Sequence, residues 1–414
     1  MTANQAEILI AVKKNDHKLS AFLPFSTGVL MWNKTSIRVQ NLKPSAIRKY
    51  FAVPSDVVTL GIGEPDFTSP DKLIEAAHKA LEHGNTHYTA NAGIFELRQA
   101  ISDKLDELYQ VKYDPESEII VTVGASEALY LAAATVLNPG DEMIVVTPCF
   151  VSYQAAVELA DGIPVEVPCR LEDNFDLNVQ AIEDAITPKT RGILLGFPNN
   201  PTGAVASREK LQQVADLAAK HDLAVISDEI YERLIYGVEH VNFASLNGAR
   251  ERTFIVGGFS KSYAMTGWRL GYVCGPKHLI PQLYKIHQYL IMSAPTIAQE
   301  IGIVAMRECE PDVERMRREY DRRRRLIVDG LNSIGLYTFE PKGAFYAFPY
   351  IAETGLDSTT FADRLLDECK VAVIPGCGFG QCGEGHVRTS YAVKYENIEE
   401  ALNRINDFVT KLKK

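Results

Sequence analysis

Apolar positions recur with two different spacings along most of the chain after about residue 70. A spacing of three to four residues predicts helices at 73–82, 94–109, 127–137 and 208–221. Short continuous apolar runs predict buried strands at 119–123, 143–147, 165–167, 192–196, 224–227, 254–257 and 270–274. Strands that alternate with helices are typical of a mostly parallel sheet covered on both faces. The pattern therefore predicts an α/β protein.

A second, smaller unit is predicted towards the C-terminus. Residues 311–332 have the pattern of one long, highly charged helix, and strands are predicted at 343–350 and 371–374. Four consecutive arginines, 322–325, could form a nucleic-acid patch. Interspersed acidic residues such as Glu319 and Asp321 favour a solvated helix face laced with salt bridges instead.

Length and charge narrow the class of protein. The 414 residues suggest two or three domains. A net charge of −10, from 43 basic and 53 acidic residues, disfavours general nucleic-acid binding. No apolar run reaches 18 residues, so no membrane span is expected. Seven scattered cysteines without a C-x-x-C pair predict a reducing cytoplasm and no metal site.

Residues 1–30 differ from the rest of the chain. Lys13, Lys14 and Lys18 precede an apolar stretch, as in a secretory signal, but no A-x-A-like cleavage site follows. We expect an N-terminal extension, and Met31 is a candidate start because the recognisable pattern begins just after it.

Loops that follow the predicted strands carry the candidate chemistry, because ligands of parallel sheets bind beyond the carboxyl ends of the strands. Strand 224–227 leads into Asp228, an acid whose burial is costly without a cationic partner. Strand 254–257 leads to Lys261 among small and apolar residues. Burial lowers the pKa of a lysine, as an imine-forming amine requires.

Two further loops predict an anion-binding helix start and a turn fixed by proline. Strand 119–123 leads through Gly124 into a helix whose first free N–H groups would bind a phosphate well. Strand 192–196 is followed by Pro198 and Pro201, which fix the backbone and could direct Asn200 into a site.

Two other enzyme classes can be weighed against these loops. Residues 124–128 (GASEA) approach the G-x-S-x-G elbow of serine hydrolases, which would make Ser126 a nucleophile. Candidate partner histidines are His221, His240, His287 and His386. A hydrolase leaves Asp228 and Lys261 unexplained. A nicotinamide dehydrogenase lacks its G-x-G-x-x-G motif, since Gly63 is followed by E-P-D.

Taken together and in order, the loops resemble those of class I/II pyridoxal-phosphate aminotransferases. The matching segments are 61–67 (GIGEPDF), 88–93 (YTANAG), 199–203 (NNPTG), 228–231 (DEIY) and 260–271 (SKSYAMTGWRLG). The resemblance extends from about Ser36 onward, within the aspartate aminotransferase superfamily of fold type I. It is greatest to the bacterial subgroup of aspartate, aromatic and N-acetyl-diaminopimelate aminotransferases.

The resemblance implies an architecture of two domains in a homodimer with shared active sites. The large domain, 76–295, would hold a mostly parallel seven-stranded sheet between helices. A smaller α+β domain would be built from both chain ends, 31–75 and 296–414. The protein would be cytoplasmic, with no nucleic-acid or membrane partner.

The resemblance also implies roles around pyridoxal 5′-phosphate. Lys261 would hold the cofactor as a Schiff base and then shuttle the substrate proton. Asp228 would pair with the ring nitrogen. Tyr231 and Asn200 would hydrogen-bond the ring oxygen, and Phe150 would stack on the ring.

The phosphate and the substrate carboxylate would have separate binding groups. The implied phosphate ligands from the same subunit are the backbone of Ala125 and Ser126 and the side chains of Ser260 and Arg269. Tyr88 would reach the phosphate from the other subunit. Relatives often carry serine where this chain has Gly258, so one phosphate contact is in question. Arg388, with Gly63 and Asn200, would bind the substrate α-carboxylate.

The implied reaction moves an amino group from an L-amino acid to a 2-oxo acid, 2-oxoglutarate, by a ping-pong mechanism. A carbon–sulfur lyase or another fold type I enzyme would keep the same loops, so that alternative stays open. Residues 285–295 hold no arginine for a second substrate carboxylate. His287, Gln288 and Tyr289 stand there instead, which favours aromatic or broadly varied amino donors.

Overall fold

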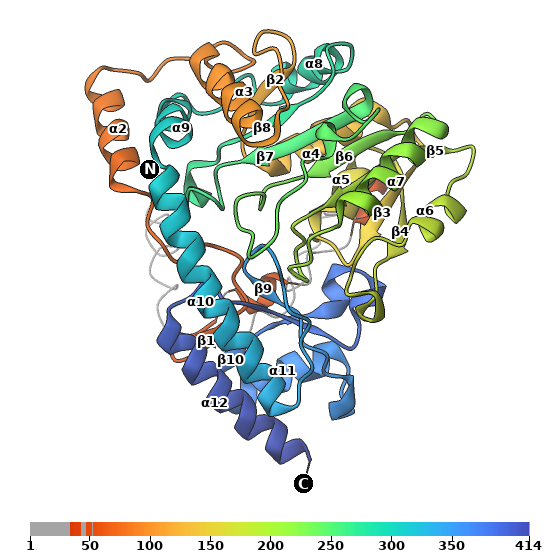
Figure 1. The fold of residues 1–414 in the computed structure, drawn as a ribbon, viewed down its shortest axis with the longest axis vertical. Helices are drawn as coiled ribbons and strands as arrows, with labels where there is room; N and C mark the ends of the chain where they lie inside the picture. Colours follow the sequence, from red (N-terminus) through yellow and green to blue (C-terminus); the bar gives the residue numbers. More distant parts are fainter. Residues whose placement is uncertain (1–33, 43–46, 52, 414) are drawn as a thin grey trace, which may run out of the picture.

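The structure is a computed structural model and describes residues 34–42, 47–51 and 53–413. The predicted extension 1–30 and the candidate start Met31 lie outside these residues. Figure 1 shows a large sheet with helices on both sides and a smaller group of strands and helices below it. Helix α10 (Glu310–Ile334) runs from one group to the other.

The large sheet has seven strands in the order β2-β8-β7-β6-β5-β3-β4. Their bounds are β2 (Ile119–Thr122), β3 (Glu142–Thr147), β4 (Ile163–Pro168), β5 (Thr190–Gly196), β6 (Ala224–Asp228), β7 (Thr253–Gly258) and β8 (Gly271–Cys274). Only β8 runs antiparallel to its neighbours, β2 and β7. The predicted mostly parallel seven-stranded sheet is confirmed.

Helices bury both faces of this sheet because apolar side chains alternate along the strands. Ile120 points into one core and Val121 into the other. The Ile120 core contains residues of α4 (Ala125–Val136), α5 (Ser152–Leu159) and α8 (Ile280–Leu290). The other core contains residues of α3 (Phe95–Tyr109), α6 (Val179–Asp184), α7 (Arg208–Lys220) and α9 (Thr296–Glu308). Each parallel strand therefore delivers its carboxyl end to one edge of a rigid layer.

The smaller group of strands joins the two ends of the described chain. Strand β1 (Val58–Thr59) pairs in parallel with β10 (Val371–Ala372). The antiparallel sheet β11-β12-β9 contains β11 (Ile374–Pro375), β12 (Val387–Ser390) and β9 (Tyr346–Ala347). The remaining helices are α1 (Ile37–Asn41), α2 (Asp71–Glu82), α11 (Ser358–Cys369) and α12 (Tyr395–Leu412). Helix α12 packs against α10 and α11.

Two predicted strands of this part were wrong in extent. The strand expected at 343–350 shrinks to β9, because Ala344 has a φ of +55° and residues 342–344 bond the 234–236 loop instead of a strand. The strand expected at 371–374 is two strands, since the chain leaves β1 after Ala372 and joins β12 at Ile374. Helices α5, α8, α9, α11 and α12 were not placed from the sequence.

The predicted charged helix is confirmed as α10. Each arginine from 322 to 325 pairs with a carboxylate: Arg322 with Glu319, Arg323 with Asp66 and Glu319, Arg324 with Asp321 and Glu340, and Arg325 with Asp321. The predicted salt bridges are confirmed, but the face is only partly solvated, because Arg323 and Arg324 are buried. Within the residues that the structure describes, no helix is long and apolar enough to cross a membrane.

Candidate active site

One cavity gathers almost all of the predicted site residues. It has a volume of about 740 Å3 and lies beyond the carboxyl ends of the parallel strands. The predicted residues that line it are Gly63, Ala125, Ser126, Phe150, Asn200, Asp228, Tyr231, Ser260, Lys261, Arg269 and Arg388. Tyr88 does not line it and is 82% exposed. The cavity thus unites loops from opposite ends of the described chain, since its lining runs from Leu42 to Arg388.

Backbone N–H groups and a guanidinium meet at one end of the cavity. Helix α4 begins at Ala125, directly after Gly124, whose φ of +76° favours glycine. A Cβ at Gly124 would come within 2.5 Å of Arg269 Nη2, so the arginine lies against the start of the helix. Arg269 Nη1 donates to the carbonyl oxygen of Thr266 at 2.8 Å. A helix start with a guanidinium beside it can bind an anion such as phosphate.

The missing serine at Gly258 has a steric reason. A Cβ there would lie 2.9 Å from Ile230 Cδ1 and 3.3 Å from Gly271 Cα. A serine would require its neighbours to shift. Residue 258 therefore offers no side-chain hydrogen-bond donor to a phosphate.

Lys261 lines the same cavity as Arg269 and Arg388. Its Nζ donates to the carbonyl oxygen of Gly63 at 2.8 Å. Burial, and then the positive charge of Arg388, lower the pKa of Lys261 to about 8. A lysine with this pKa is more often neutral near physiological pH than an exposed one, so it can act as a nucleophile or a base.

Asp228 ends strand β6 and is buried against the cavity. Tyr153 Oη donates to Oδ2 at 2.9 Å, and the Ile230 N–H donates to Oδ1 at 3.1 Å. Both donors are neutral, and burial raises the pKa of Asp228 to about 6. A cation bound in the cavity beside this carboxylate would offset its desolvation.

Arg388 lies on β12 and is buried. Its Nη1 donates to Asn200 Oδ1 at 3.0 Å, and its Nη2 donates to the Gly61 carbonyl oxygen at 2.6 Å. Both acceptors are neutral, and Nε is buried with no hydrogen-bond partner. Burial lowers the pKa of Arg388 from its ordinary value. A buried guanidinium with neutral partners is suited to accept a carboxylate from a ligand.

Two tyrosines that sequence reasoning did not single out complete the walls. Tyr153 holds Asp228, and Tyr346 Oη lies 2.8 Å from Tyr231 Oη. Tyr346 also explains Gly63, because a Cβ at that glycine would come within 2.3 Å of Tyr346 Oη. Tyr153 lies on α5, three residues after Phe150, and the pattern of residues does not show which of the two aromatic rings faces the acid.

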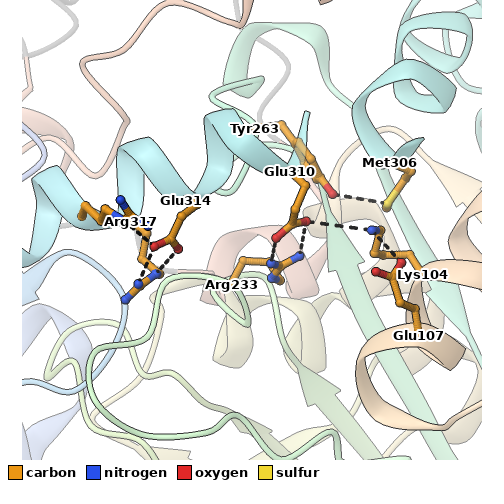
Figure 2. A network of polar contacts seen from close by, with 9 residues as sticks. Lys104, Glu107, Arg233, Tyr263, Met306, Glu310, Glu314 and Arg317 are labelled. Atoms are coloured by element: carbon orange, nitrogen blue, oxygen red, sulfur yellow. Dashed lines mark hydrogen bonds and ion pairs between the residues drawn. The ribbon is translucent and has the colours of Figure 1, made fainter. Parts of the chain in front are cut away.

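The loops that carry Tyr231 and Lys261 are anchored at the junction of α9 and α10. Figure 2 shows Arg233, two residues after Tyr231, paired with Glu310 at the start of α10. Tyr263, two residues after Lys261, donates to Met306 Sδ of α9 at 3.6 Å. Both loops are therefore anchored to α9 and α10 on the side that faces away from the cavity.

Among the described residues, the candidate histidines form no serine-hydrolase triad with Ser126. His287 contacts Glu127, His240 contacts Glu229, His386 contacts the Glu384 carbonyl oxygen, and His221 is exposed at the end of α7. None of these contacts reaches Ser126.

His287, named above in place of a second arginine, does not line the cavity, because its side chain is wholly buried between helices. Tyr289, two residues further on, is 89% exposed and does not line the cavity of its own subunit.

The fold and the cavity together define a pyridoxal-phosphate-dependent enzyme of fold type I. The chain belongs to the aminotransferase class I and II family, which it matches over residues 55–405. It is 48% identical to an aspartate aminotransferase of Pyrococcus abyssi over 376 residues, 89% of this chain and 97% of the relative. It is 45% identical to aromatic-amino-acid aminotransferase 2 of Thermococcus litoralis, again over 89% of this chain and 97% of the relative.

Solved structures agree with this assignment. The aspartate aminotransferase of Thermus thermophilus with maleate superposes with a TM-score of 0.86 at 41% identity, covering 91% of this chain and 100% of that one. An aromatic aminotransferase from Pyrococcus horikoshii superposes with a TM-score of 0.85 at 46% identity, covering 89% of this chain and 100% of that one. The chain is an aminotransferase whose cofactor is pyridoxal phosphate, and the resemblance found in its sequence is confirmed.

Proposed function

We propose that this enzyme moves an amino group from an L-amino acid to 2-oxoglutarate in two half-reactions of a ping-pong cycle. The observation that carries the proposal is the placement of Lys261 in one cavity with Asp228 and Arg388. An amine of lowered pKa, a buried acid and a buried guanidinium are the three groups that an amino-acid substrate and the cofactor ring require.

The chain's own groups fit pyridoxal phosphate. The start of α4 at Ala125 and Ser126, with Ser260 and Arg269, supports a phosphate site. Asp228 would hold a proton on the ring nitrogen, which supplies the cation that the buried carboxylate lacks. Tyr231 and Asn200 would donate to the ring oxygen, with Phe150 against the ring face. When bound, the cofactor supplies an electron sink for the carbon that carries the amino group.

Lys261 Nζ would bind the cofactor covalently and, once released, move a proton. It would take the proton from the substrate Cα and deliver it to the cofactor C4′. The hydrogen bond from Nζ to the Gly63 carbonyl oxygen supports this role, because it holds the amine beside the segment that faces the substrate. Its lowered pKa lets the same atom serve as acid and base near neutral pH.

Arg388 would orient the substrate by its α-carboxylate. Asn200 already holds one side of the guanidinium, and the unpartnered Nε lies buried beside the cavity. Gly63 lines the same cavity, so its backbone would approach the same carboxylate, while the Tyr346 hydroxyl occupies the space that a Cβ would need. We further propose that the smaller domain, 31–75 and 296–414, closes over the substrate and excludes water.

Shared active sites in a homodimer are part of the proposal. Tyr88 does not line the cavity of its own subunit and is exposed. Tyr289 near the end of α8 and Met292 just after it are also exposed, and Asn91 Nδ2 donates to the Met292 carbonyl oxygen, which brings this segment beside the Tyr88 loop. This apolar surface supports an interface through which Tyr88 would reach the phosphate of the partner. A cytoplasmic location stays a proposal that rests on seven cysteines without a disulfide.

The donor range is proposed to be broad. The cavity wall formed by residues 47–51 offers apolar Ile47 and Phe51 beside one cation, Arg48. Such a wall can accept an aromatic side chain and also an acidic one. Relatives named for aspartate and for aromatic amino acids both support this range.

Spectroscopy of the purified protein tests the function. The protein should be yellow, and borohydride reduction followed by peptide mapping should find the cofactor on Lys261. Adding amino donors one at a time should change the cofactor spectrum, and 2-oxoglutarate should restore it. A protein that stays colourless with added cofactor contradicts the proposal. Loss of thiol from cysteine derivatives, with no spectral conversion by any donor, would favour the carbon–sulfur lyase.

A further inference from the structure

A chain of buried polar contacts joins helix α8 to the start of helix α4. His287 of α8 is wholly buried, and its Nδ1 lies 2.7 Å from Glu127 Oε1. Its Nε2 lies 2.8 Å from the Asn91 carbonyl oxygen. The other oxygen of Glu127, Oε2, accepts the N–H of Val123 at 2.6 Å. None of these four groups has a part in the chemistry described above.

The partners determine where the protons are. A carbonyl oxygen only accepts, so His287 Nε2 must carry a hydrogen and donate it to Asn91. One more proton must lie between Nδ1 and Glu127 Oε1 for that contact to be a hydrogen bond. That proton can lie on either atom, because Oε2 accepts from Val123 in both cases, and the two side chains together are neutral in both.

This pair stands directly behind the anion-binding end of the cavity. Ala125 and Ser126, the first two residues of α4, line the cavity, and Glu127 is the third. Left uncompensated, a carboxylate in this first turn would repel a bound phosphate. By sharing a proton with Glu127, His287 keeps the pair neutral overall and fixes the carboxyl group that holds the backbone just before the helix.

The same histidine also holds the loop that presents Tyr88. Asn91 follows Tyr88 by three residues, and its carbonyl oxygen is the acceptor for His287 Nε2. Tyr284, one turn before His287 on α8, donates to Asn91 Oδ1 at 3.3 Å. Helix α8 therefore contacts the start of α4 through His287, and it contacts the Tyr88 loop through His287 and Tyr284.

We propose that His287 is a positioning residue for the cofactor phosphate. Through Glu127 it sets the start of α4 and neutralises the charge behind the anion site, and through Asn91 it sets the loop that would reach the partner's phosphate. The inference rests on the proposed function, because it concerns the phosphate of the same cofactor. It adds a residue that touches neither cofactor nor substrate.

Cofactor affinity of the apoprotein tests the inference. His287→Leu leaves Glu127 buried without its partner, and we expect the dissociation constant for pyridoxal phosphate to rise about tenfold or more. Glu127→Gln keeps every contact in neutral form, since the amide donates to Nδ1 and accepts from Val123, so its affinity should stay within about twofold of wild type. Combining Glu127→Gln with His287→Leu should recover part of the loss, because no buried charge is then left alone.

A second readout needs no cofactor. Inorganic phosphate should raise the melting temperature of wild-type apoprotein, and this shift should shrink in His287→Leu. The control is Arg250→Met, which breaks the half-buried pair with Glu118 just before β2, at the opposite end of the same strand. Arg250→Met should lower the melting temperature and leave both the phosphate shift and the cofactor affinity unchanged.

The outcomes separate this inference from the proposed function. Wild-type protein that takes up no pyridoxal phosphate overturns the proposed function. Uptake by wild type with equal affinity and an equal phosphate shift in His287→Leu overturns the positioning role alone. If His287→Leu does not fold, His287→Gln, which keeps one amide donor but no charge, decides the question by the same two measurements.

Discussion

The charged side chains of the cavity and those of helix α10 are balanced in opposite ways. In the cavity, buried Asp228 and Arg388 have neutral hydrogen-bond partners. On α10, the arginines 322–325 all pair with carboxylates of the chain. Burying a charge without an opposite charge costs free energy, so the cavity charges are not there to stabilise the fold. In our proposal, opposite charges on bound groups balance Asp228 and Arg388.

The same contrast occurs between two neighbouring residues. Asp228 faces the cavity with two neutral donors, whereas Glu229 faces away from it. Glu229 accepts from Ser227, from the Asn242 amide and from the Phe243 N–H, and it contacts His240. Of the two adjacent acids, the one with fewer partners is therefore the one to which we assign the cofactor in our proposal.

Removing Lys261 gives the largest expected effect. Lys261→Ala loses the amine that would bind the cofactor and move the proton, so transamination should fall on the order of 10⁴-fold. Steady-state rates with several donors measure this loss, and circular dichroism checks that the variant folds. A variant that keeps more than about a tenth of the wild-type rate contradicts the role of Lys261, since acid–base catalysis alone contributes about 10²-fold or more.

Asp228→Asn should separate catalysis from stability. The rate should fall by about 10²-fold or more, because a neutral amide cannot keep the ring nitrogen protonated. Burial raises the pKa of Asp228 to about 6 from 3.8, so the folded state holds its proton more tightly than the unfolded state. As pH rises from about 4 to about 6, wild-type apoprotein should lose up to about 3 kcal/mol of unfolding free energy that the variant keeps.

Urea unfolding of the two apoproteins at about pH 4 and pH 7 measures this difference. The matched control is Glu229→Gln. Because Glu229 has a full set of partners, its substitution should lower the unfolding free energy at pH 7 by about 1–3 kcal/mol. If Asp228→Asn and Glu229→Gln destabilise the apoprotein equally, the contrast between the two acids is wrong.

Arg388→Lys should weaken substrate binding more than it slows the later chemistry. Lysine keeps the charge but cannot hold Asn200, Gly61 and a carboxylate at once as the planar guanidinium can. The KM for amino donors should rise about 10–100-fold, with a smaller change in kcat. An unchanged KM for every donor would show that the α-carboxylate binds elsewhere.

Sequence patterns were sufficient for the parts of the fold and site that depend on local order along the chain. The seven strands of the large sheet each coincide with an apolar run; Asp228 ends one of them, and Lys261 lies in the loop after another. Positions that depend on side-chain direction were out of reach. Tyr153 and Tyr346 were not singled out, and His287, named in place of a second arginine, points into the protein.

The short strands of the smaller part show a second limit. Strands β10 and β11 look like one apolar run, yet each pairs with a different strand. Strand β10 pairs with β1, whose residues lie more than 300 positions earlier, whereas β11 pairs with the nearby β12, and no local pattern encodes which partner each strand meets. Tyr88 is a further case, since its expected role requires a second copy of the chain.

Breaking the anchor behind the site should have a moderate effect on stability. Arg233→Met removes the pair with Glu310 that is shown in Figure 2. Burial alone would raise the pKa of Glu310, but the hydrogen bond and charge of Arg233 lower it overall. The pair therefore stabilises the fold above the ordinary pKa of a glutamate, and this contribution is lost as pH falls through the lowered pKa.

The expected loss for Arg233→Met is about 1–2 kcal/mol at pH 7 and less at about pH 3. Urea unfolding at both values measures it. An equal loss at the two pH values would show that packing of the arginine stem, and not its charge, anchors the loop.

The smallest effect is expected on the exposed face of α10. Arg325 is paired with Asp321, but its side chain is 69% exposed, so water and salt screen the attraction. Arg325→Ala should change the unfolding free energy by less than about 0.5 kcal/mol and leave cofactor affinity and KM as in wild type. Arg324, one residue earlier, is buried and also bonds Glu340 and the Pro341 carbonyl oxygen, so Arg324→Ala should cost several times more. Equal losses at the two positions would mean that burial does not decide what a charge on α10 contributes, and the contrast with the cavity would lose its physical basis.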